Sequence, residues 1–352
     1  MKEQSKKKIR PQRIALIVLG VLLCILLCLI AAYFIMKAKG AKKFREELAQ
    51  QEITAHADAE LEDEGKYVTY QGKKYQYNED LITILVMGVD TELEETGADS
   101  IGANGQADTL FLVVLDSKNG ETSLINISRD AMVDVNKYNV WGEYLGTEKM
   151  QICLSYAYGD GKEKSCMNTV ESVSRLMYGM PVNAYAAMDY SGISVLNDAV
   201  GGVTVEILED FSFWDPEMRK GNVVKLRGEQ AHSYVRSRNT ELLDSNNYRM
   251  QRQRQYLLAF ISTAMNAVKK DLTLPLTLYR EMADYTVTDI RASEVTYLAS
   301  LVLEHGFTEK DMRSIPGEVV KGEEYAEFIP DEEKVFELIL EVFYNEISSS
   351  AN

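Results

Sequence analysis

Cysteine and histidine are scarce in this chain of 352 residues. The three histidines are too far apart in the sequence to form a metal cluster: His56, His232 and His305. Outside an apolar N-terminal run the chain has only two cysteines, Cys153 and Cys166. Two cysteines define no disulfide framework. A histidine-based metal centre is therefore not expected, and a bridge between Cys153 and Cys166 stays an open possibility.

Basic charge is also scarce beyond the first 45 residues. Residues 1–45 hold 11 basic side chains and one acidic side chain, which leaves 27 basic and 53 acidic side chains and a net charge of −26 for residues 46–352. Binding to a nucleic acid backbone normally needs a broad basic field. The composition therefore argues against nucleic acid as a partner.

One long apolar run is present. Residues 14–36 contain no charged side chain, and as a helix they reach about 34 Å, enough to cross a bilayer. No small-residue cleavage site follows the run, which includes Cys24 and Cys28, so it is predicted to be a retained transmembrane helix. Six Lys/Arg in residues 1–13 favour a cytoplasmic N-terminal tail. A single-pass protein of the cell membrane is expected, with everything after the span outside the cytoplasm.

The chain beyond the span divides into two parts. Residues 37–80 are predicted to form a juxtamembrane stalk and a short hairpin that turns at Gln71-Gly72. Residues 81–347 are long enough for one large extracytoplasmic α/β domain. Apolar runs predict three strands at 81–89, 109–115 and 122–128, the last two joined by the tight-turn signal Lys118-Asn119-Gly120.

Helical and strand patterns alternate after these three strands. Helices are predicted at about 149–158, 167–178, 191–199, 228–237, 249–269, 292–304 and 331–347. Further strands are predicted near 183–188, 203–207 and 325–329. This mixture favours an α-β-α domain in which helices cover both faces of a central mixed sheet. Residues 270–347 are assigned packing roles only.

Five arginines and no lysine crowd into nineteen residues of this acidic chain: Arg236, Arg238, Arg249, Arg252 and Arg254. The arginine side chain presents a planar fork of donors that matches phosphate and carboxylate oxygens. On a helix, Arg249, Arg252 and Gln253 share one face, and Met250 and Leu257 lie on another face that should be buried. The cluster is explained either by a bound phosphate group or by a solvated helix face paired with local acids.

Acidic residues gather where the first three strands would meet. In an antiparallel meander, the end of strand 81–89, the start of strand 109–115 and the end of strand 122–128 share one edge of the sheet. Asp90, Asp108 and the pair Arg129-Asp130 lie at these points. Two carboxylates beside a phosphate suit Mg²⁺. The alternative is that both aspartates cap turns and Arg129 pairs with a surface acid.

Eight short motifs occur in one order between residues 82 and 264. They are Gly88-Val-Asp90, Ala107-Asp108-Thr109, Ile127-Ser-Arg129-Asp130, Tyr156-Ala-Tyr-Gly159, Asp198-Ala-Val-Gly-Gly-Val203, Leu226-Arg-Gly-Glu-Gln-Ala231, Tyr234-Val-Arg-Ser-Arg238 and Arg249-Met-Gln-Arg-Gln253. No single motif is specific. Their order behind one membrane span resembles the LytR-CpsA-Psr family of cell-wall enzymes.

The resemblance implies a function and a set of site residues. It implies a membrane-anchored, Mg²⁺-dependent phosphotransferase that moves an anionic glycopolymer from a polyprenyl pyrophosphate lipid to peptidoglycan. Asp90 and Asp108 would hold the metal. The pyrophosphate ligands would be Arg129, Arg236, Arg238, Arg249 and Gln253. Asp108, Arg129, Arg236 and Arg238 would form the catalytic set, with Asp108 or another nearby acid as the proton acceptor.

The resemblance also implies a tunnel for the lipid tail, with candidate walls at Val173, Leu176, Met177, Ile193 and Leu196. Three positions depart from the family pattern: Glu92 and Gln106 stand where arginine is usual, and Asn246 where aspartate is usual. A lost guanidinium would cost about 3–4 kcal/mol of barrier by analogy with an oxyanion donor. A catalytically weakened lipid-pyrophosphate-binding or regulatory member of the family is therefore the alternative function.

Overall fold

The computed structural model describes residues 31–44, 52–90, 101, 104–237, 245–305, 307–322 and 325–347. Most of the predicted transmembrane run, residues 14–30, lies outside the described residues, and residues 31–44 form a helix. Among the described helices, none combines the length and the apolar character needed to cross a bilayer. The sequence-based prediction of a membrane anchor therefore stays a prediction.

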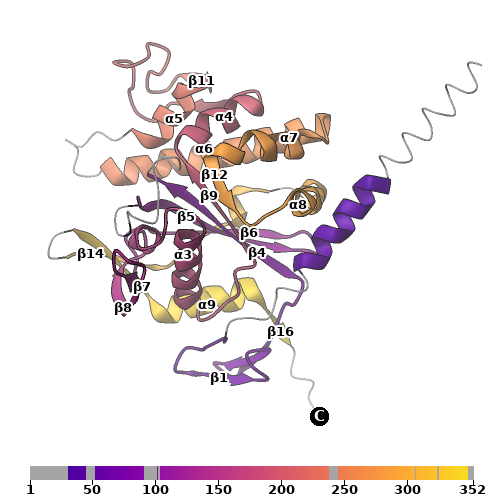
Figure 1. The fold of residues 1–352 in the computed structure, drawn as a ribbon, viewed down its shortest axis with the longest axis vertical. Coiled ribbons are helices and arrows are strands. Elements are labelled where there is room, and N and C mark those ends of the chain that lie inside the picture. Colours follow the sequence, from indigo (N-terminus) through magenta and orange to yellow (C-terminus); the bar gives the residue numbers. More distant parts are fainter. Residues whose placement is uncertain are drawn as a thin grey trace, which may run out of the picture.

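A six-stranded mixed sheet forms the centre of the molecule (Figure 1). Strands β4 (Leu81–Val89), β5 (Ala107–Asp116) and β6 (Thr122–Ile127) form the predicted antiparallel meander. Strand β9 (Ala184–Asp189) runs parallel to β4, and β12 (Thr286–Thr288) pairs with β9. At the other edge, β13 (Met312–Ser314) runs parallel to β6. The prediction of a central mixed sheet is thus confirmed.

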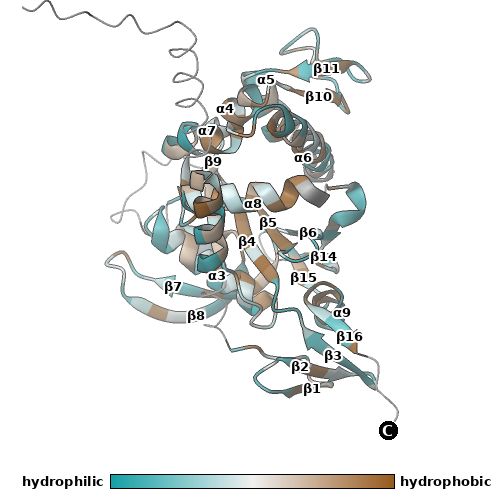
Figure 2. Cartoon of the chain, turned by 90° about the vertical axis from the view of Figure 1, so that its right-hand side faces the viewer, coloured by the Kyte–Doolittle hydropathy of each residue, from teal (hydrophilic) through white to brown (hydrophobic). Residues whose placement is uncertain are grey.

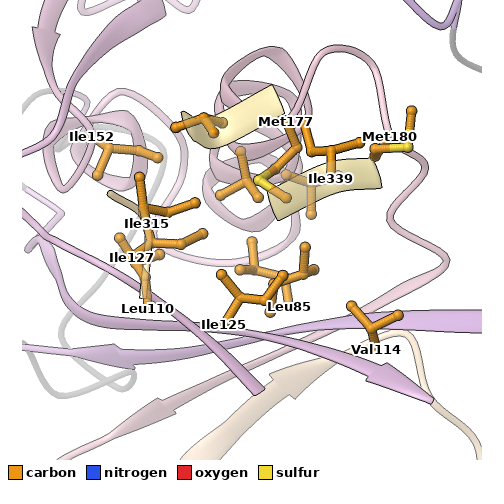
Figure 3. Packing of buried hydrophobic residues seen from close by; sticks show 14 of the residues in the cluster. Leu85, Leu110, Val114, Ile125, Ile127, Ile152, Met177, Met180, Ile315 and Ile339 are labelled. Carbon is orange, nitrogen blue, oxygen red and sulfur yellow. The ribbon is translucent and has the colours of Figure 1, made fainter. Parts of the chain in front are cut away.

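The first face of this sheet packs against helices α3 (Glu163–Leu176) and α9 (Glu332–Phe343). Because side chains alternate along a strand, Leu85, Leu110 and Ile125 all point to this side, where Ile339 of α9 joins them (Figure 3). Three of the five predicted tunnel-wall residues belong to this core: Val173, Leu176 and Met177. Their place in this core supports the alternative of ordinary packing, and a role as walls of a lipid tunnel stays a prediction.

Helix α8 (Ala292–His305) and the helix over residues 31–44 cover part of the second face. Phe44 is 2% exposed and packs against Tyr297 of α8, with ring centroids 6.3 Å apart. Beside them the Lys43 ammonium lies 3.5 Å from the carboxylate of Glu294, which is buried. The segment after the predicted span is therefore packed on the domain along residues 40–44.

Four more helices extend over the second face toward the end of β4 (Figure 1). They are α4 (Ser191–Ala199), α5 (Glu229–Arg236), α6 (Ser245–Lys270) and α7 (Leu274–Glu281). The hairpin of β10 (Val203–Glu206) and β11 (Val223–Leu226) packs with them around a separate core that contains Ala231, Tyr234 and Tyr256.

Smaller elements surround the main sheet. Strands β1 (Ala59–Glu62), β2 (Tyr67–Tyr70), β3 (Lys73–Tyr77) and β16 (Tyr344–Ile347) form one sheet, in which β2 and β3 are the hairpin expected around Gln71-Gly72. Strand β14 (Gly317–Lys321) pairs with β15 (Ala326–Pro330). Two short 3-10 helices are η2 (Ala283–Tyr285) and η3 (Glu309–Asp311).

Two predicted helices differ from the structure. Residues 149–151 complete β8 (Tyr144–Gln151), which pairs with β7 (Met132–Tyr138), and only α2 (Leu154–Ala157) of the predicted helix 149–158 is helical. Helix α9 ends at Phe343, and the next four residues pair with β3 instead of continuing the helix. The hairpin partner β7 in the first place, and the distant strand β3 in the second, complete the backbone hydrogen bonds. Cys153 and Cys166 are free, buried thiols.

Candidate functional site

A β-bulge displays Asp108 at the edge of the sheet. Gly88 on β4 pairs with Thr109 on β5, and the next residue, Val89, pairs with Ala107, so Asp108 is the extra residue between them. Bulges near active sites re-aim a side chain out of the regular ladder. Immediately beyond the bulge the Asp90 carboxylate accepts a hydrogen bond from the backbone N–H of Gln106 at 2.5 Å. The two predicted metal ligands are thus brought to one edge of the sheet.

Arg129 binds Asp108 directly. One guanidinium nitrogen donates to the Asp108 Oδ1 atom. The other donates to the Gln106 Oε1 atom at 2.5 Å and lies 3.4 Å from the Cys153 Sγ atom. The side chain is 25% exposed, so the guanidinium is held on three sides and still reaches solvent. The alternative holds in part, because Asp90 does accept a backbone N–H as a capping residue would, whereas the partner of Arg129 is Asp108, whose side chain is 12% exposed.

The backbone of Cys153 joins the two halves of this arrangement. Its N–H donates to the carbonyl of Arg129, and its carbonyl accepts from the N–H of Ala107. Burial raises the pKa of the Cys153 thiol to about 11, although Arg129 acts in the opposite direction. The thiol is therefore neutral near pH 7, and the residue acts as a buried spacer between the strand that carries Asp108 and the turn that carries Arg129.

Tyr190, just before α4, connects Asp108 to Arg236, and no motif of the sequence had pointed to it. Its hydroxyl donates to the Asp108 Oδ2 atom at 3.0 Å. The Arg236 guanidinium lies over its ring, 4.9 Å from the centroid. Burial raises the Tyr190 pKa, the Asp90 charge raises it further, and the nearby arginines lower it. The phenol is therefore protonated near pH 7 and able to donate to Asp108.

The structure places the other predicted ligands around this centre. Arg236 is exposed at the last turn of α5, and Arg249 and Gln253 line one cavity with Asp108 and Arg129. The Gln253 amide also donates to the carbonyl of Val235 at 3.2 Å, which ties α6 to the end of α5. Arg238 lies outside the described residues, so its predicted role stays a prediction.

Arg252 does not face the site. Its side chain is 1% exposed and donates to the backbone carbonyls of Tyr234 and Ser237, and its Nε atom lies 2.8 Å from the Glu209 carboxylate. The guanidinium also lies 4.8 Å from the centroid of the Phe211 ring. Helix α6 therefore buries a face that includes Arg252, whereas Met250, predicted to be inward, is 39% exposed. Two hydrogen bonds to backbone carbonyls and the ion pair with Glu209 explain why an arginine is buried on this face.

The cavity beside Asp108 and Arg129 has a volume of about 270 Å³. Strands β5, β6 and β13 and helix α6 contribute its walls. Asp130 is one of the lining residues, and its Oδ1 atom accepts from the Gln151 amide at 3.2 Å. Burial raises the pKa of the Asp130 carboxyl, and Arg129 and Arg249 partly offset that effect. The cavity therefore contains a cationic wall and a carboxyl group that is a better base than an ordinary aspartate.

An apolar part of the sheet lies next to this cavity. Val86 is 36% exposed although β4 has a paired strand on each side. Phe111 on β5 faces the same side as Val86, lies opposite it in the register and lines the cavity. Figure 2 shows the apolar stretches of β4 and β5 beside α6 and α8. An incompletely covered apolar face on a central strand is typical of a binding surface for an apolar group.

The donor set fits a hard divalent cation in chemical type. Asp90 and Asp108 supply carboxylate oxygens, and Mg²⁺ commonly takes one or two carboxylates and completes its shell with water and substrate phosphate. Both Asp108 oxygens already accept a hydrogen bond, yet each oxygen keeps a second lone pair. Within the described part of the chain, no group of three or more His, Cys, Asp or Glu side chains gathers as a metal site.

Comparisons with known proteins identify relatives of this chain. The chain is 31% identical over 246 residues to the polyisoprenyl-teichoic acid–peptidoglycan teichoic acid transferase TagV of Bacillus subtilis, covering 67% of this chain and 56% of that protein. It is 28% identical to the corresponding TagU protein of Enterococcus faecalis, covering 54% of this chain and 55% of TagU. The chain thus spans about half the length of these curated relatives.

The crystal structure of Bacillus subtilis TagV has the same fold, with a TM-score of 0.57 and 26% identity over 74% of this chain and 96% of that one. A structure of TagT bound to LI-WTA matches the fold at a TM-score of 0.53 and 21% identity, over 75% of this chain and 89% of that one. The model of the LytR_cpsA_psr family matches residues 40–341. This match covers most of the chain, which therefore belongs to the LytR_cpsA_psr family.

Proposed function

We propose that this protein transfers an anionic glycopolymer from a polyprenyl pyrophosphate carrier to peptidoglycan. The observation that carries the proposal is the convergence of Asp108, Arg129 and Arg249 on one cavity, with Arg236 joined to Asp108 through Tyr190. Arginine forks match phosphate oxygens. The names of the relatives TagV and TagU supply the substrate class, a polyisoprenyl-linked teichoic acid and peptidoglycan.

The apolar face at Val86 and Phe111 gives the proposal a place for the lipid. A polyprenyl chain bound there would have its pyrophosphate beside Arg129 and Arg249, because Phe111 lines the same cavity as these arginines. We also propose that the run 14–36 anchors the protein in the cell membrane, with the domain outside the cytoplasm. An anchor of this kind would keep the site beside its lipid donor and raise the effective concentration.

In the proposed reaction a hydroxyl group of peptidoglycan attacks the sugar-bound phosphorus of the donor. A bond from that hydroxyl oxygen to phosphorus forms, the bond to the bridging oxygen of the pyrophosphate breaks, and the lipid phosphate leaves. Arg129, Arg236 and Arg249 would orient the diphosphate and stabilise charge that develops on its oxygens. Asp90 and Asp108 would hold Mg²⁺, which when bound would neutralise part of the diphosphate charge.

Asp130 is our candidate for the group that accepts the proton of the attacking hydroxyl. It lines the cavity, and its raised pKa makes it the stronger base. Asp108 is less suitable, because both of its oxygens already accept hydrogen bonds from Arg129 and Tyr190. The alternative assignment, with Asp108 as the acceptor, makes a different prediction for pH dependence.

The function is tested with the full-length chain in detergent micelles and a synthetic polyprenyl pyrophosphate-linked sugar. Wild type should release lipid phosphate in the presence of Mg²⁺ and a peptidoglycan acceptor, whereas Asp90→Ala and Arg236→Ala should be slowed. If wild type binds the donor but releases no lipid phosphate, the protein is instead a binding or regulatory member of the family. If wild type binds no donor, the proposed site is wrong.

The rate of transfer should fall on acidification at a higher pH than an ordinary aspartate would produce. A general base acts only when it is deprotonated, and burial raises the pKa of Asp130 above its usual value of about 3.9. The pH profile of kcat/KM for wild type and Asp130→Asn measures this effect. The variant should lose about 100-fold or more in rate. Its kcat/KM should also no longer show the fall at low pH, the acid limb of the profile, that titration of Asp130 produces. An unchanged acid limb in the variant would favour Asp108 as the base.

Tyr190→Phe should lower kcat about tenfold or more and leave the protein folded. The variant keeps the ring beneath Arg236 and removes only the hydrogen bond to Asp108, and a bond to a charged group contributes about 1.5–3 kcal/mol. Tyr190→Leu also removes the ring, so its KM for the donor should rise as Arg236 loses its support. Steady-state kinetics of the two variants separate these roles, and equal kcat in wild type and Tyr190→Phe would show that the hydroxyl is dispensable.

A further inference from the structure

Two arginines of the cavity have no role in the proposed transfer. Arg254 comes from α6 and Arg313 from β13, and both line the same cavity as Arg129 and Arg249. The carboxylates among the lining residues are Asp108 and Asp130. Four guanidinium groups therefore border the cavity against two carboxylates, although residues 46–352 carry a net charge of −26. Glu309 and Glu341 balance the charge of Arg254 and Arg313 at present. An excess of positive charge that would concentrate anions arises where these two ion pairs open.

Each of these two arginines now forms an ion pair with a partly exposed glutamate. Arg254 lies 3.1 Å from the Glu309 carboxylate, and the two side chains are 52% and 71% exposed. Arg313 donates from Nε and one terminal nitrogen to the same Glu341 oxygen, at 3.2 and 3.0 Å, and these side chains are 32% and 59% exposed. Its other terminal nitrogen donates to the backbone carbonyl of Lys310, so Arg313 is held more firmly than Arg254. Exposed ion pairs contribute about 0–1 kcal/mol. An arriving phosphate can therefore replace a glutamate partner at little cost and gain a charge-assisted, bidentate bond.

The spacing of the two groups of arginines suits a second anionic group on the same substrate. Arg249 and Arg254 are five residues apart on α6, which corresponds to about 7.5 Å along the helix axis. Both side chains line the same cavity, so the cavity offers two cationic positions at different heights along α6. Arg313 approaches from β13, which runs beside β6 at the edge of the sheet. The cavity thus leads from the pyrophosphate ligands to a second cationic pair.

We propose that Arg254 and Arg313 form a second anion subsite, which binds the first phosphate or other anionic group of the polymer beyond the donor pyrophosphate. This inference rests on the proposed transfer function and adds a determinant of donor specificity. Arg313 also borders a second, more acidic cavity that contains Asp116, Glu121 and Asp311. A longer polyanion would be repelled there. The subsite therefore recognises an anionic group on the first units of the polymer and does not discriminate polymer length.

The test compares two synthetic donors that differ in one group. Both carry the same polyprenyl pyrophosphate and sugar, and one sugar bears an additional phosphate. The full-length chain in detergent micelles is used, and KM and, by calorimetry, the Kd are measured for each donor. We expect wild type to prefer the phosphorylated donor about tenfold, as for other charge-assisted contacts. The double variant Arg254→Gln/Arg313→Gln should bring the ratio of the two KM values close to one.

Two controls belong to this experiment. Arg175→Gln removes an arginine that is similarly exposed and similarly paired, with Glu171, outside the cavity, and should keep the wild-type ratio. Glu309→Gln removes the competing partner of Arg254 and should increase the preference for the phosphorylated donor.

The possible outcomes separate this inference from the proposed function. If wild type uses or binds both donors equally well, or if the double variant keeps the wild-type preference, the subsite is wrong while transfer stands. If wild type releases no lipid phosphate from either donor, transfer is wrong, and the calorimetric ratio of the two donors still decides whether the subsite exists. A thermal unfolding curve of the double variant verifies that the loss of two exposed pairs leaves the fold intact.

Discussion

Arg129→Lys is expected to lower kcat for transfer about 100- to 1000-fold, the loss seen when one preorganised donor is removed from a charged transition state. The substitution keeps the positive charge. It removes the planar fork that now binds Asp108 through one nitrogen and Gln106 through the other. A lysine ammonium cannot make both contacts and also present a donor to phosphate. Single-turnover release of lipid phosphate measures the effect.

A matched substitution shows whether the loss at Arg129 is specific. Arg175→Lys changes an arginine whose partner is Glu171 and which does not line the cavity, and should leave kcat within twofold of wild type. Because the Arg129 guanidinium also contacts the buried Cys153 Sγ atom at 3.4 Å, the thermal unfolding of Arg129→Lys should be compared with wild type. A folded variant with wild-type kcat would show that Arg129 does not contact the reacting phosphate.

Arg252→Ala is expected to lower the free energy of unfolding by about 3 kcal/mol. Removing one partner of a buried ion pair costs about 3–5 kcal/mol, and the lower value is appropriate because Glu209 is still 21% exposed. The substitution also leaves the carbonyls of Tyr234 and Ser237 without their donor. Urea unfolding monitored by circular dichroism gives the change.

The neighbouring arginine is the control for this prediction. Arg254→Ala removes a side chain that is 52% exposed and should change the free energy of unfolding by less than about 1 kcal/mol. The two arginines are two positions apart on α6, so they differ in burial and not in helix context. Equal losses in both variants would contradict a structural role for Arg252.

The structure changes the meaning of one departure from the family pattern. Gln106 stands where the resemblance predicts arginine, but its side chain is not left without function, because its Oε1 atom accepts from Arg129. An arginine at the same place would put a second guanidinium beside Arg129. Gln106 is therefore better understood as a residue that orients Arg129 than as a missing phosphate ligand. Glu92 lies outside the described residues, as does the side chain of Asn246, so these two departures stay open.

Elements with a strong local pattern were predictable. The strands 81–89, 109–115 and 122–128 are continuous or alternating apolar runs, and they form the predicted meander with shifts of one or two residues at their ends. Helix 191–199 was predicted with the correct bounds. By contrast, residues 149–151 of β8 and all of β16 were predicted as helix. In the structure β8 forms a hairpin with β7, and β16 pairs with the distant strand β3, and both pairings override the local periodicity.

The residue types and their order in the chain were enough to indicate the LytR_cpsA_psr family, and that resemblance selected Asp90, Asp108, Arg129 and Arg249 as candidate site residues. The tertiary structure decided which neighbours they have. It buried Arg252 in the helical layer, brought Tyr190 onto Asp108, and added Arg313 to the cavity wall. These contacts join residues that are distant in the chain, and sheet order and helix packing determine such contacts where no local sequence signal exists.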